Sequence, residues 1–325
     1  KLSLRMAGES MQDAAADKAA ENEMGKAATP MPTVGFITLG CAKNEVDTDH
    51  MAALLADAGF ALCRAQLLGD LEDEEHDEAA CVVRESDVIV VNTCSFLTSA
   101  AQEAVDTILD VLGQHDFVPG ASKLVVAGCL PSRYGEDLAA ELPEVDAFVP
   151  AACEDDIVSY VRDVCGLGAD DATAATGRAT SPEGTRTLSV LRTTAEPWAY
   201  VKISEGCDRF CSFCTIPMIR GRYESRPFSD IASEVGALVA RGVAEIVLIG
   251  QDTGIWGEDL ADAPTVEERN VKSPRNLAQL LGTLAQRFPE TWFRVMYLQP
   301  EGITDELLAT MAAYGNLCDY LDIPL

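Results

Sequence analysis

Three apolar runs in the first half of the chain each end in a small residue followed by a cysteine. The runs end at Leu39-Gly40-Cys41, Asn92-Thr93-Cys94 and Ala127-Gly128-Cys129. Helical patterns separate them, and continuous apolar runs are typical of strands buried on both faces, so we expect a parallel sheet covered by helices on both sides. The carboxyl edge of such a sheet is where ligands bind, and all three cysteines are expected there.

The spacing of apolar residues predicts the order of elements in this first domain. We expect a doubly wound (flavodoxin-like) α/β domain at 32–165. Its strands are expected at 34–39, 60–63, 88–92, 123–127 and 147–149, and its helices near 44–59, 97–113, 135–142 and 155–164. An acidic run at 71–78 is expected to be a solvated loop.

These strand-end cysteines allow two interpretations. Free cysteine is often buried as a small apolar side chain, so the recurrence can be a coincidence. Three thiols delivered to one edge can instead converge on one metal centre, which we favour because the same placement recurs. The cysteines that lack this placement are interpreted as packing residues: Cys63, Cys81, Cys153, Cys165 and Cys318.

A second cysteine motif follows another apolar strand, expected at 198–203. Cys207, Cys211 and Cys214 form a C-x3-C-x2-C loop directly after it. A structural zinc site or an electron-transfer cluster normally takes four protein ligands, and no fourth cysteine lies nearby in the sequence. The motif therefore favours a 4Fe–4S cluster with one iron open to a small molecule. A zinc site completed by a distant cysteine is the alternative.

Strands and helices continue to alternate beyond this loop. We expect strands at 245–249, at 292–298 and from about 320, and helices near 228–241, 276–288 and 304–314. Repeated βα units indicate a truncated, partial β/α barrel at 191–325, with its chemistry at the strand ends. A small, polar linker is expected at 166–190, and residues 1–31 are expected to form a disordered tail.

Composition restricts the class of protein further. The chain has eleven cysteines, no apolar leader and no apolar run long enough to span a membrane, so we expect a cytoplasmic protein whose clustered cysteines bind metal. The net charge of −29 disfavours a nucleic-acid backbone and favours basic partners. Because the chain begins at Lys1 and stops within an expected strand, we expect a piece of a longer protein.

The two cysteine sets together resemble those of a known family. The C-x3-C-x2-C loop after the first barrel strand, with aromatic Phe213 before its last cysteine, resembles the motif of radical S-adenosylmethionine enzymes. A leading doubly wound domain with three single cysteines resembles the methylthiotransferases among them. The resemblance implies two 4Fe–4S clusters and S-adenosylmethionine. The radical-generating cluster would be held by Cys207, Cys211 and Cys214, and the auxiliary cluster by Cys41, Cys94 and Cys129.

Two branches of this family are close, and the motifs favour one of them. One branch modifies an adenosine of transfer RNA; the other adds a methylthio group to the β-carbon of an aspartate of small-subunit ribosomal protein S-twelve. The stretches 39–47, 92–100, 250–253 and 320–325 resemble the ribosomal-protein branch, and residues 40–44 lack the Gly-Cys-Gln-Met-Asn pattern typical of the other. The transfer-RNA enzyme remains an alternative, as does a non-catalytic iron–sulfur or zinc protein.

The resemblance also implies partners and further parts. Expected partners are the ribosomal protein or the ribosome, a sulfur donor, and an electron donor such as flavodoxin or ferredoxin, with no membrane. The rest of the barrel and a small β-barrel substrate domain (TRAM) are expected outside these 325 residues.

A few single residues are expected near the cofactor. Phe213 is expected beside the adenine, and Gly250 and Gln251 beside the methionine end of S-adenosylmethionine. Plain packing for Phe213, and a simple turn at Gly250-Gln251, are the alternatives. Three arginines near the loop suit a substrate or cofactor carboxylate, or a solvated face: Arg220, Arg222 and Arg226. The histidines show no ligand pairing and receive no role: His50, His76 and His115.

Overall fold

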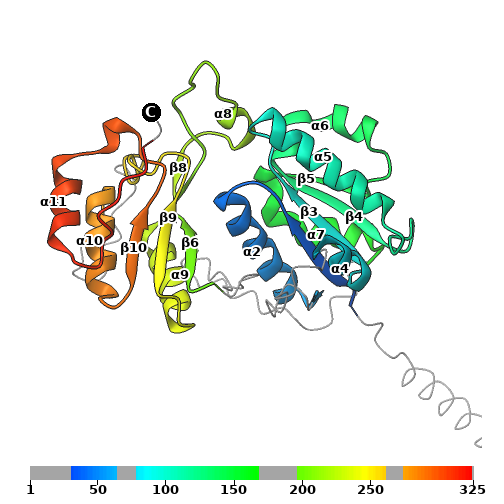
Figure 1. Cartoon of the computed structure of the whole chain (residues 1–325), viewed down its shortest axis with the longest axis horizontal. Helices are drawn as coiled ribbons and strands as arrows, with labels where there is room; N and C mark the ends of the chain where they lie inside the picture. The colour runs from blue at the N-terminus through cyan, green and yellow to red at the C-terminus, as the bar shows by residue number, and fades with distance from the viewer. Residues whose placement is uncertain (1–30, 64–77, 168–195, 261–273, 324–325) are drawn as a thin grey trace, which may run out of the picture. The chain divides into compact units, whose positions relative to one another are not determined.

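The computed structural model describes residues 31–63, 78–167, 196–260 and 274–323. Figure 1 shows two parallel sheets in this part of the chain, each with its own helices. The expected tail, acidic loop and linker fall almost entirely outside the described residues.

The first sheet has five strands in the order β2-β1-β3-β4-β5, and every neighbouring pair is parallel. The strands are β1 (Thr33–Thr38), β2 (Ala61–Leu62), β3 (Val88–Thr93), β4 (Lys123–Gly128) and β5 (Ala147–Pro150). This order is the flavodoxin-like arrangement, so the predicted fold class of the first domain is confirmed. All six residues of the central strand β3 are buried, as expected for a strand covered on both faces.

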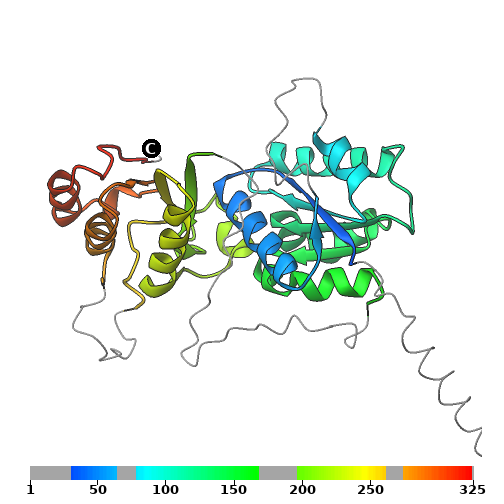
Figure 2. The same cartoon turned by 90° about the horizontal axis from the view of Figure 1, so that it is seen from below.

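Helices cover both faces of this sheet. On one face α4 (Glu78–Glu85), α5 (Thr98–Gly113) and α6 (Cys129–Glu141) share an apolar cluster with alternate residues of β3 and β4. On the other face α2 (Ala42–Asp57) contacts α7 (Ile157–Val164), which follows the short 3-10 helix η1 (Ala151–Asp156) (Figure 2).

The second sheet has three parallel strands in the order β10-β9-β6. They are β6 (Trp198–Lys202), β9 (Glu245–Ile249) and β10 (Trp292–Val295). The helices α9 (Phe228–Ala240), α10 (Leu277–Arg287) and α11 (Asp305–Ala313) close one apolar core with these strands. The repeated parallel βα units confirm the predicted fold class of the second domain.

Two very short strands enclose the three-cysteine loop. β7 (Ser204–Glu205) pairs antiparallel with β8 (Glu224–Ser225), and the one-turn helix α8 (Ile216–Ile219) lies between them. Another short 3-10 helix, η3 (Pro300–Gly302), precedes α11. None of the described helices combines the length and the apolar composition needed to cross a bilayer.

Three local features differ from the predictions. Helix α6 already begins at Cys129, but it is kinked at Gly135, whose φ of 50° is not helical, and its second half agrees with the helix expected near 135–142. Helix α4 was not predicted, since it directly follows the acidic run. Strand β10 ends at Val295, because Tyr297 adopts a φ of 64° that no strand accommodates. No described residue from 320 to 323 belongs to a strand.

Candidate functional site

The three strand-end cysteines of the first sheet lie at one edge. Cys41 directly precedes α2, Cys94 directly follows β3, and Cys129 is the first residue of α6. Cys94 and Cys129 share a side-chain hydrogen bond. A Cβ added to Gly40 would lie 2.3 Å from the Cβ of Cys94, so the backbone beside Cys41 touches Cys94. The fold therefore places the three cysteines at one edge of the sheet, and their convergence on one metal centre stays a prediction.

The hydrogen bond between two of these thiols makes their acidities unequal. The Cys129 thiol donates to the sulfur of Cys94, and this lowers the pKa of Cys94 to about 6 against the opposing effect of burial. The same bond, together with burial, raises the pKa of Cys129 above its ordinary value. Because the thiolate is the form that binds metal, Cys94 is disposed to act as a ligand.

Two buried asparagines hold the start of α2 against the end of β3. Nδ2 of Asn44 donates to Oδ1 of Asn92 at 3.1 Å and to the carbonyl oxygen of Thr93 at 3.0 Å. Nδ2 of Asn92 donates in return to the carbonyl oxygen of Asn44 at 2.9 Å. Buried amides that satisfy each other in this way fix geometry, so Cys41 and Cys94 are held on rigid supports.

The second cysteine set lies on the loop between β7 and α8. The amide of Cys214 donates to the carbonyl oxygen of Cys211 at 2.9 Å, which curls the end of the loop. At the start, Gly206 has a φ of 71°, and a Cβ there would lie 2.0 Å from the carbonyl oxygen of Arg222. Only glycine fits that approach, which sets where Cys207 begins the motif.

An ion pair anchors the middle of this loop to the end of β9. Nε of Arg209 lies 2.5 Å from Oδ2 of Asp252, whose side chain is fully buried. The next residue, Phe210, adopts a φ of 47°, a left-handed conformation that non-glycine residues seldom take. The surrounding contacts therefore impose the loop's shape before any ligand is bound.

The three residues expected near S-adenosylmethionine lie around this loop. Phe213 is 83% exposed, so the described chain does not bury its ring. A Cβ on Gly250 would lie 2.4 Å from Oγ of Ser204, which explains the glycine as a close approach of β9 to β7. Nε2 of Gln251 donates to Oε1 of Glu205 at 2.6 Å. Their roles toward the cofactor stay predictions.

Both sets consist of cysteine thiols, the side chains that hold iron–sulfur clusters. Within the described residues, no three Cys, His, Asp or Glu side chains gather closely enough to hold one ion. A cubane cluster spreads its three cysteine ligands over three different irons, so its thiolates do not need to surround a common point. Ligation itself stays a prediction for all six cysteines.

A buried ion cluster, formed by Asp47, Lys202, Glu205 and Arg220, links the two cysteine sets. Both Nζ of Lys202 and Nη1 of Arg220 lie 2.6 Å from the carboxylate of Asp47. Lys202 also lies 2.5 Å from Oε2 of Glu205. Nη2 of Arg220 donates to Sγ of Cys129 at 3.4 Å. Arg220 is the residue that ends α8, just after the cysteine loop, so its side chain connects that part of the chain to Cys129.

The charges of this cluster support one another. Burial on its own would raise the pKa of Asp47, but Arg220 and Lys202 hold it at about 2. Burial would lower the pKa of Arg220, yet Asp47 and Glu205 raise it well above its ordinary range. Asp47 and Arg220 are therefore both ionised at neutral pH and form a buried ion pair.

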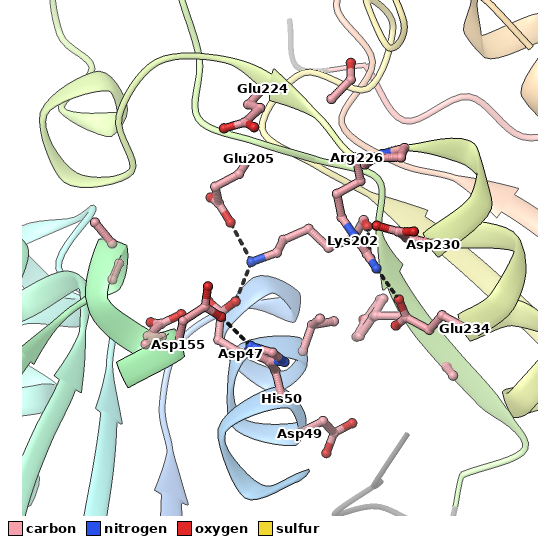
Figure 3. Close-up of a pocket in the computed structure, with 18 of the residues that line it drawn as sticks. Asp47, Asp49, His50, Asp155, Lys202, Glu205, Glu224, Arg226, Asp230 and Glu234 are labelled. Atoms are coloured by element: carbon pink, nitrogen blue, oxygen red, sulfur yellow. Dashed lines mark hydrogen bonds and ion pairs between the residues drawn. The ribbon is translucent and has the colours of Figure 1, made fainter. Parts of the chain in front are cut away.

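A cavity of about 460 Å³ opens beside the ion cluster, and its wall is predominantly acidic (Figure 3). One side comes from α2 and η1, the other from β6, β8 and the start of α9. Figure 3 shows Asp49, Glu224 and Asp230 around it. Oε1 of buried Glu154 also lines it and has no hydrogen-bond partner among the described residues. The cavity thus favours a positively charged group.

Sequence patterns did not identify the ion cluster. Lys202 interrupts the apolar strand Trp198–Lys202, and a cation in such a run is a signal of a buried pair that deserved weight. Asp47 gives no such signal, because it lies within helix α2 and an acidic residue in a helix is ordinarily exposed. Arg220 was expected to suit the carboxylate of a substrate or cofactor, but in the structure it pairs with the carboxylate of Asp47.

The remaining residues singled out from the sequence have ordinary partners. Arg222 lies 2.7 Å from Asp208, and Arg226 lies 2.7 Å from Glu234. His50 lies 2.7 Å from Asp155, His115 is exposed, and His76 lies outside the described residues. Of the cysteines interpreted as packing residues, Cys63, Cys81 and Cys318 are buried, whereas Cys153 and Cys165 are half-buried.

Two family models match the chain in the order expected from its motifs. Residues 33–150 match the uncharacterized protein family UPF0004, and residues 201–325 match the radical SAM superfamily. The first match contains all three strand-end cysteines, and the second contains the C-x3-C-x2-C loop.

Curated relatives match across both regions. A protein of Symbiobacterium thermophilum is 40% identical over 294 residues, covering 90% of this chain and 53% of the relative. A protein of Desulfosudis oleivorans is 37% identical over 295 residues, covering 90% of this chain and 59% of the relative. Each is named ribosomal protein uS12 methylthiotransferase RimO. The chain thus spans little more than half the length of these relatives.

Solved structures share the fold at much lower identity. The radical S-adenosylmethionine methyltransferase TsrM of Kitasatospora setae matches with a TM-score of 0.59 at 15% identity, covering 90% of this chain and 58% of that one. The cobalamin-dependent radical enzyme OxsB matches with a TM-score of 0.53 at 12% identity, covering 91% and 44%. A doubly wound domain followed by a radical S-adenosylmethionine domain, with this cysteine pattern and these relatives, places the chain in the methylthiotransferase family of radical S-adenosylmethionine enzymes, in its RimO-type group.

Proposed function

We propose that the protein containing this chain adds a methylthio group to the β-carbon of an aspartate of ribosomal protein uS12. The observation that carries the proposal is the pair of cysteine sets, one at each sheet's carboxyl edge, with Arg220 reaching from the end of one set's loop to Cys129 of the other. Generating a radical and supplying sulfur are two tasks, and two adjacent centres separate them.

The radical S-adenosylmethionine family uses a 4Fe–4S cluster and S-adenosylmethionine, and we propose a second such cluster on Cys41, Cys94 and Cys129. When bound, the cluster of the C-x3-C-x2-C loop and its cofactor supply one-electron chemistry that removes hydrogen from an unactivated carbon. A side-chain base is poorly suited to that task, because the β-carbon of an ionised aspartate is far too weak an acid at neutral pH.

The chain's own residues hold the two centres in place. The ion pair of Arg209 with Asp252 fixes the cysteine loop, and the buried pair of Arg220 with Asp47 fixes that loop's end against α2. Such chemistry needs a rigid site, because the substrate radical must react with sulfur and not with another nearby group.

The acidic cavity supports a basic protein as the substrate. The side chains of Asp49, Glu224 and Asp230 favour positive charge, and the chain's net charge of −29 acts in the same direction at long range. We further propose a sulfur donor and a one-electron donor, such as flavodoxin or ferredoxin, as partners in the cytoplasm.

Mass spectrometry of uS12 tests the substrate. In a strain from which the gene is deleted, we expect uS12 to lose the methylthio mass on its aspartate while transfer RNA keeps its methylthio adenosine. The reverse pattern would assign the protein to transfer RNA. Anaerobic reconstitution tests the chemistry: zinc in place of iron and sulfide, without cleavage of S-adenosylmethionine, contradicts the proposal.

A further inference from the structure

Lys43 joins the carboxyl edge of the first sheet to that of the second. It lies in the first turn of α2, two residues after Cys41. Its Nζ sits 3.1 Å from the centroid of the Tyr297 ring, and Tyr297 follows the end of β10. A cation on an aromatic face at this distance is held in a defined place. The ammonium group therefore stands where both cysteine-bearing edges meet.

The Lys43 ammonium has no ion-pair partner among the residues that the structure describes. Of the groups that favour its positive charge, the Cys41 thiol acts most strongly, followed by the carboxylates of Glu205 and Asp322. Glu205 is engaged by Lys202 at 2.5 Å and by Gln251 at 2.6 Å. Asp322 accepts the amide of Tyr297 at 2.9 Å. Because neither carboxylate forms an ion pair with Lys43 in the described part of the chain, its half-buried ammonium is able to pair with an anion that binds there.

The ring beneath Lys43 is held in a strained conformation. The backbone of Tyr297 has a φ of 64°, a left-handed conformation that is unfavourable for a non-glycine residue. Besides its bond to Asp322, its carbonyl oxygen accepts the backbone amide of Thr253 at 3.2 Å. Strain of this kind persists where contacts from several segments enforce it, and it is concentrated at functional sites.

We propose that Lys43 is the residue that binds the side-chain carboxylate of the substrate aspartate. The inference rests on the proposed function. In an aspartate the carboxylate is bonded directly to the β-carbon, so a β-carbon presented to the cysteine loop brings a negative charge within one bond of the reacting atom. Lys43 supplies the counter-charge at that place, and charge-assisted hydrogen bonds of this type are the strong ones.

The proposal makes charge on the substrate a determinant of binding. Lys43 then discriminates aspartate from its neutral isostere asparagine, which has the same shape and no charge. S-adenosylmethionine also carries a carboxylate, so the experiment must separate the two sources. A peptide pair that differs only in this charge, with the affinity for S-adenosylmethionine measured alongside, does so.

The test measures dissociation constants on the anaerobically reconstituted, full-length protein that contains this chain. Two fluorescent uS12 peptides are compared, one with the target aspartate and one with asparagine in its place. We expect the wild type to prefer the aspartate peptide by about tenfold or more, and Lys43→Met to abolish that preference while leaving the asparagine peptide unchanged. Lys43→Arg should retain the preference. The matched control Lys123→Met, at the opposite end of β4, should behave as wild type.

Three outcomes overturn the proposal. If Lys43→Met weakens both peptides equally, Lys43 does not recognise the carboxylate. If it instead weakens S-adenosylmethionine about tenfold and leaves the peptide preference intact, the carboxylate is the cofactor's. If the wild type binds neither peptide, the proposed function fails and the inference with it. Circular dichroism of each variant and the Lys43→Arg result separate loss of charge from loss of fold.

Discussion

Nη1 of Arg220 lies 2.6 Å from Oδ2 of Asp47, and both side chains are almost completely buried. The two residues are 173 positions apart, so the pair ties helix α2, which begins at the strand-end cysteines, to the end of the C-x3-C-x2-C loop. A buried ion pair that also contacts Cys129 makes the relative placement of the two cysteine sets depend on electrostatics as well as packing.

Replacing Asp47 with asparagine should destabilise the fold strongly. The change removes the carboxylate that lies 2.6 Å from both Arg220 and Lys202 and leaves Glu205 as the nearest remaining ion-pair partner of each. We expect the free energy of unfolding to fall by about 3 kcal/mol, measured by urea denaturation followed by circular dichroism. The exposed pair of Asp116 and His115 gives the control, because Asp116→Asn should change the free energy of unfolding by no more than about 0.5 kcal/mol. Equal effects would mean that the Asp47 pair is not desolvated.

Glu154 should make stability depend on pH in the opposite sense to an ordinary paired carboxylate. Burial first, and then the charge of Asp47, raise the pKa of Glu154 well above 4.5 in the folded state. The fold therefore favours its protonated form, and stability is lost as the pH rises above 4.5 through the folded pKa.

The variant Glu154→Gln imitates the protonated form and should remove this loss. We expect its stability relative to wild type to be unchanged near pH 4.5 and to become more favourable toward about pH 8, measured by urea unfolding at each pH. Exposed Glu144→Gln serves as the control and should show no such trend. A stabilisation that is the same at every pH would contradict the assignment.

The sequence predicted most of the fold because its signals are local. Continuous apolar runs predict β3 and β4. Because a cysteine directly follows each run, its position at the carboxyl edge of the sheet can be predicted as well. The pairing of Asp47 with Arg220 has no local signal, because it depends on how two domains meet. The left-handed φ of Tyr297 also has no local signal, since tyrosine ordinarily favours a strand. Its backbone hydrogen bonds with Thr253 and Asp322 hold the turn, and these depend on the tertiary structure.

Gly40 should be needed for the strand-end cysteine set. A Cβ at this position would lie 2.3 Å from the Cβ of Cys94, so Gly40→Ala pushes the backbone beside Cys41 away from Cys94. We expect the iron content after reconstitution to fall from about eight to about four per chain, while cleavage of S-adenosylmethionine remains.

Gly59→Ala is the matched control for Gly40→Ala. Gly59 has a similar positive φ, 91° against 102°, but an added Cβ would meet nothing within 4 Å. The control therefore shares the backbone strain and lacks the steric clash. If both variants lose the same amount of iron, strain in the backbone rather than contact with Cys94 is responsible.

Cys94→Ala should separate the two proposed centres. The substitution removes one thiol of the strand-end set and leaves Cys207, Cys211 and Cys214 untouched. We expect cleavage of S-adenosylmethionine to continue at close to the wild-type rate, while methylthio insertion into uS12 falls at least about a hundredfold. Liquid chromatography of the nucleoside product and mass spectrometry of uS12 measure the two activities in one reaction. Cys318→Ala is the control, because it truncates a cysteine of similar burial outside both sets, and it should preserve both activities.

A different result would contradict the separation. If Cys94→Ala loses cleavage together with insertion, while Cys318→Ala keeps both activities, the two cysteine sets work as one centre.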